Sequence, residues 1–290
     1  MTGRIIDGLK VAIEIRSQVK KAVDKLKNDS VIPCLATVLV GDDPASSTYV
    51  KNKQKAAADV GIVTRDHRFP SNLTQKELLE LIRQLNQDKH VHGILVQLPL
   101  PKHMDEFEIV DSIDPIKDVD GLTPFNAGML LNGKANIKPC TPSGIIELLD
   151  FYKIDVNTMD AVIVNRSNLV GKPLALLLLQ RNATVTVCHS KTKILSDKLK
   201  NADLLITAVG NRESFKLTPD LVKDDAVVID VGITRINGNL IGDVDFQSVK
   251  EKVSWITPVP GGVGPMTVCM LLKNTSIAAA ALTLSNELSK

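Results

Sequence analysis

Apolar residues recur at helical spacing in two stretches of the first half of the chain. Residues 7–27 alternate apolar side chains with lysines in the pattern of an amphipathic helix, and residues 74–85 place apolar side chains on one helical face. Apolar runs at 35–40 and 93–98 are long enough for buried strands and too short for helices. A more polar run at 62–69 predicts another strand. We therefore expect the first half to alternate strands and helices.

The second half opens with the pattern of a βαβ unit. Residues 161–164 form a short apolar run, a polar turn follows, and an apolar helix starts near Pro173, which suits a first helical turn. Residues 184–188 return to a β-branched strand. Two further apolar runs lie at 203–209 and 226–231. This pattern predicts a Rossmann-like fold with a mainly parallel sheet.

Three other segments mark the organisation of the chain. Residues 123–138 carry proline, asparagine and glycine and resemble a connection between domains. Residues 237–239 read Asn-Gly-Asn, a tight turn of the hairpin kind. A rigid turn rich in glycine and proline, 257–265, precedes a final helix, 266–288, whose alanine run predicts close packing. A chain of 290 residues can form two domains or one large α/β domain.

Composition narrows the class of protein. Hydrophobic residues make up 44% of the chain, which is ample for a core and excludes disorder. The net charge is +2, with 35 basic and 33 acidic residues, and this balance argues against a nucleic acid or a membrane surface as the main partner. Aromatic residues are only 3% of the chain, which disfavours base-stacking platforms.

The cysteines and histidines predict neither disulfides nor a metal site. The cysteines, Cys34, Cys140, Cys188 and Cys269, lie far apart without C-x-x-C spacing, and the five histidines are scattered. Buried free thiols in a reducing compartment are the expected state.

We find no signal peptide, and no apolar run approaches the roughly 20 residues of a membrane span. The sequence thus predicts a soluble, cytoplasmic protein.

The first turn of the predicted βαβ unit is the usual place for a dinucleotide pyrophosphate. No Asp or Glu lies between Asp160 and Asp197, although an acidic residue after the second strand would bind the ribose of NAD. Arg166 in the turn and Ser190 after the second strand suit a phosphomonoester. We therefore favour NADP. A βαβ unit without a ligand and a solvated basic edge are the alternatives.

The turn lacks a full G-x-G-x-x-G pattern. Asn165 stands where glycine would be expected, and only Gly171 is present. Asparagine tolerates a positive φ better than other non-glycine residues, so the turn can survive. If Asn165 strains the turn, glycine at this position should tighten cofactor binding.

Tyr49 and Lys53 lie four residues apart on the helix that follows the first long strand, so they share a helix face. Gln97, Asp120 and the glycine-rich turn fall at strand ends or in loops, where ligands bind in open α/β sheets. The strand ends of both halves could therefore line one cleft. The alternative for Lys53 is an ordinary solvated lysine, because charged lysines flank it.

The chain resembles a known family over essentially its whole length. The segments that carry the resemblance are SSTYVKNKQKAAADVGI (46–62), GILVQLPLP (93–101), DPIKDVDGLTPFNAG (114–128), PCTPSGI (139–145), NRSNLVGKPL (165–174), HSKT (189–192) and TPVPGGVGPMT (257–267). They are similar to the family of bifunctional methylenetetrahydrofolate dehydrogenase/methenyltetrahydrofolate cyclohydrolases. The family has glycine where this chain has Asn165.

The resemblance implies an enzyme of one-carbon metabolism with two α/β domains and a cleft between them. Residues 1–138 would form the folate-binding catalytic domain, on which the helix 266–290 packs back, and residues 139–265 the Rossmann domain. The enzyme would oxidise 5,10-methylenetetrahydrofolate with NADP and hydrolyse the product to 10-formyltetrahydrofolate. A homodimer joined through the Rossmann domains is also implied.

The resemblance also implies roles for individual residues. Lys53 would be the catalytic lysine, Gln97 would bond to it, Tyr49 would lie over the aminobenzoyl ring and Asp120 would bind the pterin. Further substrate contacts would come from Pro260, Gly261 and Gly262. The cofactor-contacting positions would be Asn165, Arg166, Ser167, Ser190 and Ile233.

Two rival functions stay open at this point. One is a dehydrogenase that has lost cyclohydrolase activity, although Tyr49, Lys53, Gln97 and Asp120 are all present. The other is a non-catalytic binder of folate or nucleotide, which the retention of both half-sites disfavours.

Overall fold

The computed structural model describes the backbone of residues 2–42 and 44–288 and the side chains of residues 2–42 and 50–284. The chain divides into two compact units. Met1–Ile13 and Thr141–Thr267 form the six-stranded unit, and Glu14–Cys140 and Val268–Lys290 form the three-stranded unit. Each unit contains a parallel sheet with helices, so the expectation of two α/β domains is confirmed.

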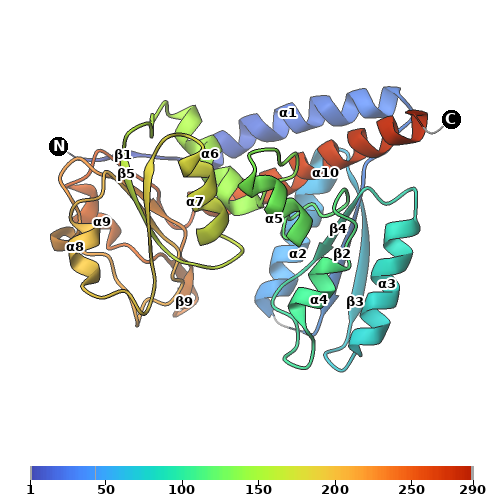
Figure 1. Ribbon diagram of the computed structural model, residues 1–290, viewed down its shortest axis with the longest axis horizontal. Coiled ribbons are helices and arrows are strands. Elements are labelled where there is room, and N and C mark those ends of the chain that lie inside the picture. The colour runs from blue at the N-terminus through green and yellow to red at the C-terminus, as the bar shows by residue number, and fades with distance from the viewer. Residues whose placement is uncertain (1, 43, 289–290) are drawn as a thin grey trace. The chain divides into compact units, whose positions relative to one another are not determined.

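The sheet of the three-stranded unit has the order β3-β2-β4, and neighbouring strands pair in parallel. The central strand β2 is buried along its whole length, because it has a neighbour on each edge and a helix on each face. Helices α2 and α3 lie on opposite faces of this sheet (Figure 1). The elements are β2 (Cys34–Val40), β3 (Val63–Phe69), β4 (Gly93–Val96), α2 (Pro44–Asp59), α3 (Gln75–Gln87), α4 (Glu106–Asp111), α5 (Pro124–Leu131) and the larger parts of α1 (Gly8–Asn28) and α10 (Val263–Leu288).

The sheet of the six-stranded unit has the order β1-β11-β8-β7-β5-β6 and is parallel throughout its described strands. Helix α7 lies on one face, and α8 and α9 lie toward the other (Figure 1). The strands are β1 (Arg4–Ile5), β5 (Asp160–Val164), β6 (Thr184–Cys188), β7 (Leu204–Thr207), β8 (Val227–Asp230) and β11 (Trp255–Ile256), with a separate hairpin of β9 (Thr234–Ile236) and β10 (Asn239–Ile241). The helices are α6 (Cys140–Phe151), α7 (Gly171–Leu179), α8 (Leu195–Leu199), α9 (Phe246–Lys250) and the 3₁₀ turn η1 (Pro219–Leu221).

Local signals account for several elements. Thr74 caps α3 with a capping box, in which its hydroxyl accepts from the Glu77 amide and the Glu77 carboxylate accepts from the Thr74 amide. The hairpin turn has the positive φ angles that its sequence predicts, 50° at Asn237 and 81° at Gly238.

The expected connection at residues 123–138 is partly helical, which corrects the prediction for this segment. Helix α5 begins after Thr123, whose hydroxyl accepts a hydrogen bond from the Asn126 amide at 3.3 Å. Pro124 occupies the first helical turn, where it needs no hydrogen-bond partner for its nitrogen. These two start signals were present in the sequence.

Helix α10 also departs from expectation. By length and composition alone, Val263–Leu284 could cross a membrane, contrary to the expectation that no apolar run approaches this length. Half of its most apolar stretch is nevertheless buried inside the protein, and the small residues Ala278 and Ala279 are fully buried. A core helix has this same length and composition, so the apolar character of α10 does not by itself indicate a membrane span.

Candidate active site

Lys53 and Gln97 form a hydrogen-bonded pair in the three-stranded unit. Lys53 lies on α2 with only 7% of its surface exposed, and its Nζ donates to Gln97 Oε1 at 3.0 Å. Gln97 directly follows β4, and its backbone amide bonds to the carbonyl of Val38 in the neighbouring strand. Its Nε2 donates to the carbonyl of Leu98 at 2.8 Å, which leaves Oε1 facing the lysine. Lys53 is therefore a buried, fixed lysine and not a solvated one.

Asp120 lies within electrostatic reach of Lys53. Burial raises the pKa of Asp120, and the positive charge of Lys53 opposes this shift. Cys140 is a further neighbour: its thiol contacts the carbonyl of Val119 at 3.4 Å, and burial together with the charge of Asp120 raises its pKa well above the usual value. The sequence-predicted residues Lys53, Gln97 and Asp120 thus gather in one unit.

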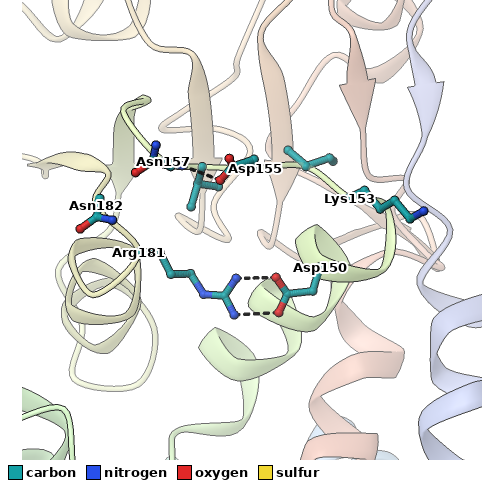
Figure 2. A pocket seen from close by; sticks show the side chains of 8 residues that line it. Asp150, Lys153, Asp155, Asn157, Arg181 and Asn182 are labelled. Atoms are coloured by element: carbon teal, nitrogen blue, oxygen red, sulfur yellow. Dashed lines mark hydrogen bonds and ion pairs between the residues drawn. The ribbon is translucent and has the colours of Figure 1, made fainter.

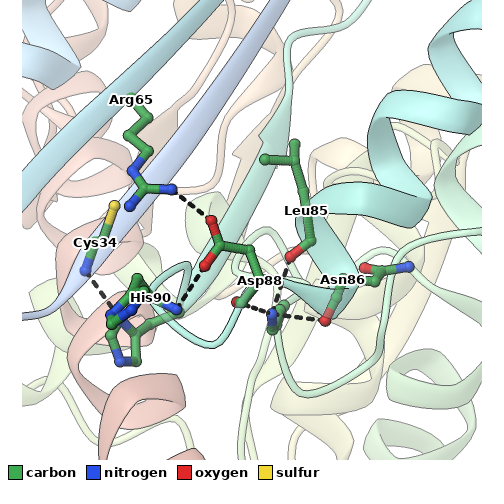
Figure 3. Close-up of polar contacts among 8 residues, drawn as sticks. Cys34, Arg65, Leu85, Asn86, Asp88 and His90 are labelled. Carbon is green, nitrogen blue, oxygen red and sulfur yellow. Dashed lines mark hydrogen bonds and ion pairs between the residues drawn. The ribbon is translucent and has the colours of Figure 1, made fainter.

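The loop that carries Asp120 is anchored by a buried lysine. Lys117 is 3% exposed, and its Nζ donates to the carbonyls of Leu85, Asn86 and Asp88 at 2.9, 2.7 and 2.8 Å (Figure 3). These carbonyls belong to the end of α3, where a positive charge also interacts favourably with the helix dipole. Lys117 therefore fixes the loop three residues before Asp120.

Two more buried side chains hold the same loop. Asp118 is 1% exposed and accepts from the Thr123 amide at 2.8 Å and from Asn126 Nδ2 at 2.9 Å. Asn274 on α10 donates to the carbonyls of Val119 and Lys138 at 2.8 and 2.9 Å. Sequence reasoning did not single out Lys117, Asp118 or Asn274, although the first two lie inside the segment that carries the resemblance.

Tyr49 cannot be compared with these residues, because its side chain lies outside the described side chains. Its expected position on the Lys53 face of α2 stays a prediction.

Asn165 organises the turn after β5. Its Oδ1 accepts from the Ser167 amide at 2.8 Å, the Ser167 hydroxyl at 2.7 Å and the Gly171 amide at 3.0 Å, while its Nδ2 donates to the carbonyl of Ala208 at 2.6 Å. Its φ is not positive, so the expected reason for strain is absent. A Cβ at Gly171 would overlap the Asn165 backbone, and glycine is therefore required there.

Replacing Asn165 by glycine is expected to weaken this turn, because it removes all four side-chain hydrogen bonds. The expected cost is about 1–2 kcal/mol in the free energy of unfolding, with a higher Michaelis constant for the dinucleotide. Thermal unfolding and steady-state kinetics measure the two effects. Asn168→Gly is the matched control, since the Asn168 side chain is exposed and its one bond among the described residues is to Lys172. Tighter dinucleotide binding in Asn165→Gly would contradict the expectation.

The other predicted cofactor residues follow three strands of the six-stranded unit. Arg166 and Ser167 follow β5, Ser190 follows β6 and Ile233 follows β8. The turn around Ser190 is fixed, because the His189 amide bonds to the Thr192 hydroxyl and the Lys191 amide to the His189 ring. In a parallel sheet these positions share the carboxyl edge, where ligands bind. Arg166 and Ser190 are both exposed.

The turn of Pro260, Gly261 and Gly262 lies in the same unit. Gly261 has a φ of 103° and accepts a hydrogen bond from the Gly8 amide at 2.9 Å, and a Cβ at Gly262 would come within 2.5 Å of the Pro258 carbonyl oxygen. Glycine is therefore needed for the backbone path at both positions.

A surface hollow of the six-stranded unit offers no comparable site. Its lining residues include Asp150, Asp155 and Arg181 (Figure 2). Arg181 forms a bidentate ion pair with Asp150, and Asp155 accepts from the backbone amide of Asn157. The hollow also precedes β5 and β6 in the chain and so lies away from the carboxyl edge. Within the described residues, no group of three or more His, Cys, Asp or Glu side chains could hold a metal ion.

Comparison with known proteins assigns both parts of the chain to one family. Family models of tetrahydrofolate dehydrogenase/cyclohydrolase match residues 6–120 (catalytic domain) and 139–283 (NAD(P)-binding domain). The chain is 54% identical to the bifunctional protein FolD of Nitrosopumilus maritimus, over 100% of each chain. It is similar to the crystal structure of the bifunctional FolD enzyme of Campylobacter jejuni (48% identity, TM-score 0.93, 96% of this chain and 99% of that one). The Trypanosoma brucei enzyme, complexed with NADP and an inhibitor, is 37% identical, with a TM-score of 0.91 and coverage of 97% and 98%.

The six-stranded unit is Rossmann-like and carries hydroxyl and basic side chains at its strand ends. The second α/β unit contains a buried lysine. Together these features define a two-domain dehydrogenase. The chain belongs to the tetrahydrofolate dehydrogenase/cyclohydrolase family. It is a bifunctional enzyme of one-carbon metabolism, a methylenetetrahydrofolate dehydrogenase and methenyltetrahydrofolate cyclohydrolase. The resemblance drawn from the sequence motifs is thereby confirmed.

Proposed function

We propose that the chain oxidises 5,10-methylenetetrahydrofolate with NADP and hydrolyses the methenyl product to 10-formyltetrahydrofolate, with Lys53, Gln97 and Asp120 at the folate. The observation that carries this proposal is the buried Lys53 side chain, whose Nζ lies 3.0 Å from Gln97 Oε1 with Asp120 in electrostatic reach. A buried lysine with one neutral partner is suited to proton transfer, which the second reaction requires.

The first reaction needs orientation more than acid–base catalysis. The hydride leaves a carbon that lies between two nitrogens, and their lone pairs stabilise the resulting cation. NADP, when bound, supplies the hydride acceptor. The residues of the chain hold the folate carbon in the reactive geometry, which can lower the barrier by several kcal/mol. No side chain has to remove a proton in this step.

The second reaction adds water to the methenyl carbon and then breaks a C–N bond. In this step the neutral amine of Lys53 takes a proton from the attacking water, and the ammonium so formed returns it to the leaving nitrogen. Gln97 keeps the lysine Nζ in place through its Oε1. Asp120 accepts hydrogen bonds from the pterin N–H groups, and Tyr49 lies over the aminobenzoyl ring. Pro260, Gly261 and Gly262 contribute backbone contacts to the substrate.

The six-stranded unit suits NADP for a chemical reason. Arg166, Ser167 and Ser190 follow the adjacent strands β5 and β6, and no carboxylate lies between Asp160 and Asp197. A guanidinium and a hydroxyl bind a phosphate, whereas the missing carboxylate removes the usual ribose ligand of NAD. Ile233 and Asn165 complete the cofactor-contacting positions.

Arg166→Ala is expected to raise the Michaelis constant for NADP by roughly 10- to 100-fold and to change that for NAD much less, because only NADP carries the 2′-phosphate. Steady-state dehydrogenase kinetics with each cofactor measure the difference. Lys172→Ala, an exposed cation of the same turn that bonds to Asn168, is the control. Equal increases in the Michaelis constants for both cofactors would show that Arg166 does not bind the 2′-phosphate.

The activity itself is tested with two assays on the purified enzyme. NADPH formation from 5,10-methylenetetrahydrofolate measures the dehydrogenase, and the loss of added 5,10-methenyltetrahydrofolate measures the cyclohydrolase. A chain that performs only the first reaction is a dehydrogenase alone, and a chain that performs neither refutes the proposal.

A homodimer in the cytoplasm completes the proposal. The edge strand β6 of the six-stranded unit carries the half-exposed Val187, and Leu169 and Leu179 are exposed at 46% and 52%. Within the described residues β6 has no strand on its outer edge, and this edge together with exposed apolar side chains of the same unit supports pairing with a second copy. The four cysteines are buried and form no disulfide bond within the described residues, which agrees with a reducing compartment. The mass of the enzyme in solution tests the dimer.

A further inference from the structure

Asp243 is a fully buried carboxylate that binds two successive backbone amides. Its exposed fraction is 0%, its Oδ2 accepts from the Val209 amide at 2.7 Å, and its Oδ1 accepts from the Gly210 amide at 3.0 Å. Val209 and Gly210 belong to the loop that follows β7. Each carboxylate oxygen therefore has its own N–H donor, and both are needed to fix the loop.

The same carboxylate packs against the loop that follows β8. A Cβ at Gly232 would overlap the Asp243 carboxylate, so only glycine fits there. Gly210, with a φ of 63°, lies against the backbone of Ile233, since a Cβ would be 3.6 Å from its carbonyl oxygen. The Arg212 amide also bonds to the Thr234 hydroxyl at 3.1 Å. Asp243 thus holds the loops after β7 and β8 together.

A second buried carboxylate fixes Asp243 itself. Asp230, the last residue of β8, is 3% exposed. It accepts from the amides of Asp243 and Val244 at 3.0 and 2.9 Å and from the Gly232 amide at 3.2 Å. The backbone that carries Asp243 is therefore attached to the end of the strand beside it.

Burying these two groups is unfavourable without compensation. Burial raises the pKa of both carboxyl groups, that of Asp230 to about 6, while Arg212 opposes the shift at Asp243. The described hydrogen bonds to the Asp243 carboxylate come from the backbone amides of Val209 and Gly210. These donors stabilise its negative charge, and the carboxylate in turn fixes the loop to which they belong. An apolar side chain could fill the same space, but it could not fix two successive amides.

The strand order assigns the loops after β7 and β8 to one half of the cofactor. The chain runs from β5 to β6 on one side and then returns to β7 and β8 on the other side of β5. In Rossmann folds the dinucleotide pyrophosphate binds at the point where the strand order reverses in this way. The ribose with the 2′-phosphate lies beyond the second strand, which is β6 here. The nicotinamide half then extends toward the ends of β7 and β8.

We propose that Asp243 is a positioning residue of the dehydrogenase reaction, which aligns the nicotinamide half of NADP by holding the Val209–Gly210 loop against the Gly232–Ile233 loop. This inference rests on the proposed function, and it adds a residue to which no role has been given above. Asp243 acts through the two loops and does not touch the reacting atoms.

Asp243→Asn tests the proposal, because an amide has one acceptor oxygen and turns an NH₂ group toward one of the two backbone amides. The dehydrogenase kcat is expected to fall at least about tenfold, with a smaller change in the Michaelis constant for NADP, since a misplacement near 1 Å can cost about 100-fold. The cyclohydrolase rate with added 5,10-methenyltetrahydrofolate needs no cofactor and is expected to stay within about twofold.

Thr234→Val is the second variant and preserves the shape of the side chain while it removes the hydroxyl that binds the Arg212 amide. It is expected to lower the dehydrogenase kcat by a smaller factor than Asp243→Asn does and to leave the cyclohydrolase rate unchanged. If Asp243→Asn does not fold, Thr234→Val tests the proposal by itself. Asp220→Asn, an exposed carboxylate of the same unit, is the control for both variants. A parallel loss of both activities, or no loss in either variant, overturns the role of Asp243. Wild-type enzyme without dehydrogenase activity would instead refute the proposed function.

Discussion

Replacing Lys53 by methionine is expected to abolish the cyclohydrolase reaction and to leave much of the dehydrogenase reaction. Methionine has a similar length and can fill the same buried space, but it cannot accept or donate a proton. General acid–base catalysis typically contributes 10²- to 10⁴-fold, and the cyclohydrolase kcat should fall by about that factor. Hydride transfer needs no side-chain base, so the dehydrogenase kcat should stay within about tenfold of the wild-type value.

The flanking lysines provide matched controls for this experiment. Lys51 and Lys55 lie on the same helix but are exposed, so Lys51→Met and Lys55→Met should leave both activities unchanged. The two rates are measured separately, with methylenetetrahydrofolate and NADP for the first and with methenyltetrahydrofolate alone for the second. An equal loss of both activities in Lys53→Met would contradict the proposed division of labour. It would indicate that Lys53 mainly holds the substrate or the fold.

The fold was predicted well where apolar runs are long. Strands β2 and β8 and the helix α3 follow from uninterrupted apolar runs or from helical spacing. The strands β1 and β11 have two residues each, and their pairing joins Arg4 and Ile5 to residues 255 and 256. Such strands have no local periodicity, because their contacts with distant segments define them.

The candidate site was predicted through its chemistry but not through its supports. Gln97 and Asp120 were singled out because they fall at a strand end and in a loop, and Lys53 because it shares a helix face with Tyr49; their roles came from the family resemblance. Asn274 and Asp243 were missed, since their partners Val119 and Gly210 are known only from the folded chain. Asn165 shows the same limit: the sequence indicated tolerance of a positive φ, whereas the fold uses its side chain to bind the turn.

Lys117→Met is expected to destabilise the three-stranded unit strongly and to weaken folate binding. The substitution leaves the carbonyls of Leu85, Asn86 and Asp88 without their ammonium donor in a buried position. Each unsatisfied buried acceptor costs about 1–3 kcal/mol, and the lost interaction with the end of α3 adds to this. We expect the free energy of unfolding to fall by about 3 kcal/mol, which lowers the Tm by roughly 6–12 °C.

The kinetic effect of Lys117→Met should be selective, because Lys117 lies three residues before Asp120 and in the other unit from the NADP-contacting positions. The Michaelis constant for methylenetetrahydrofolate should therefore rise while that for NADP stays the same, at a temperature where the variant is folded. Lys134→Met, an exposed lysine of the same unit, should change neither the Tm nor the kinetics. A lower Tm with an unchanged Michaelis constant for methylenetetrahydrofolate would mean that Asp118 and Asn274 alone keep Asp120 in place. These two residues hold the loop independently of α3.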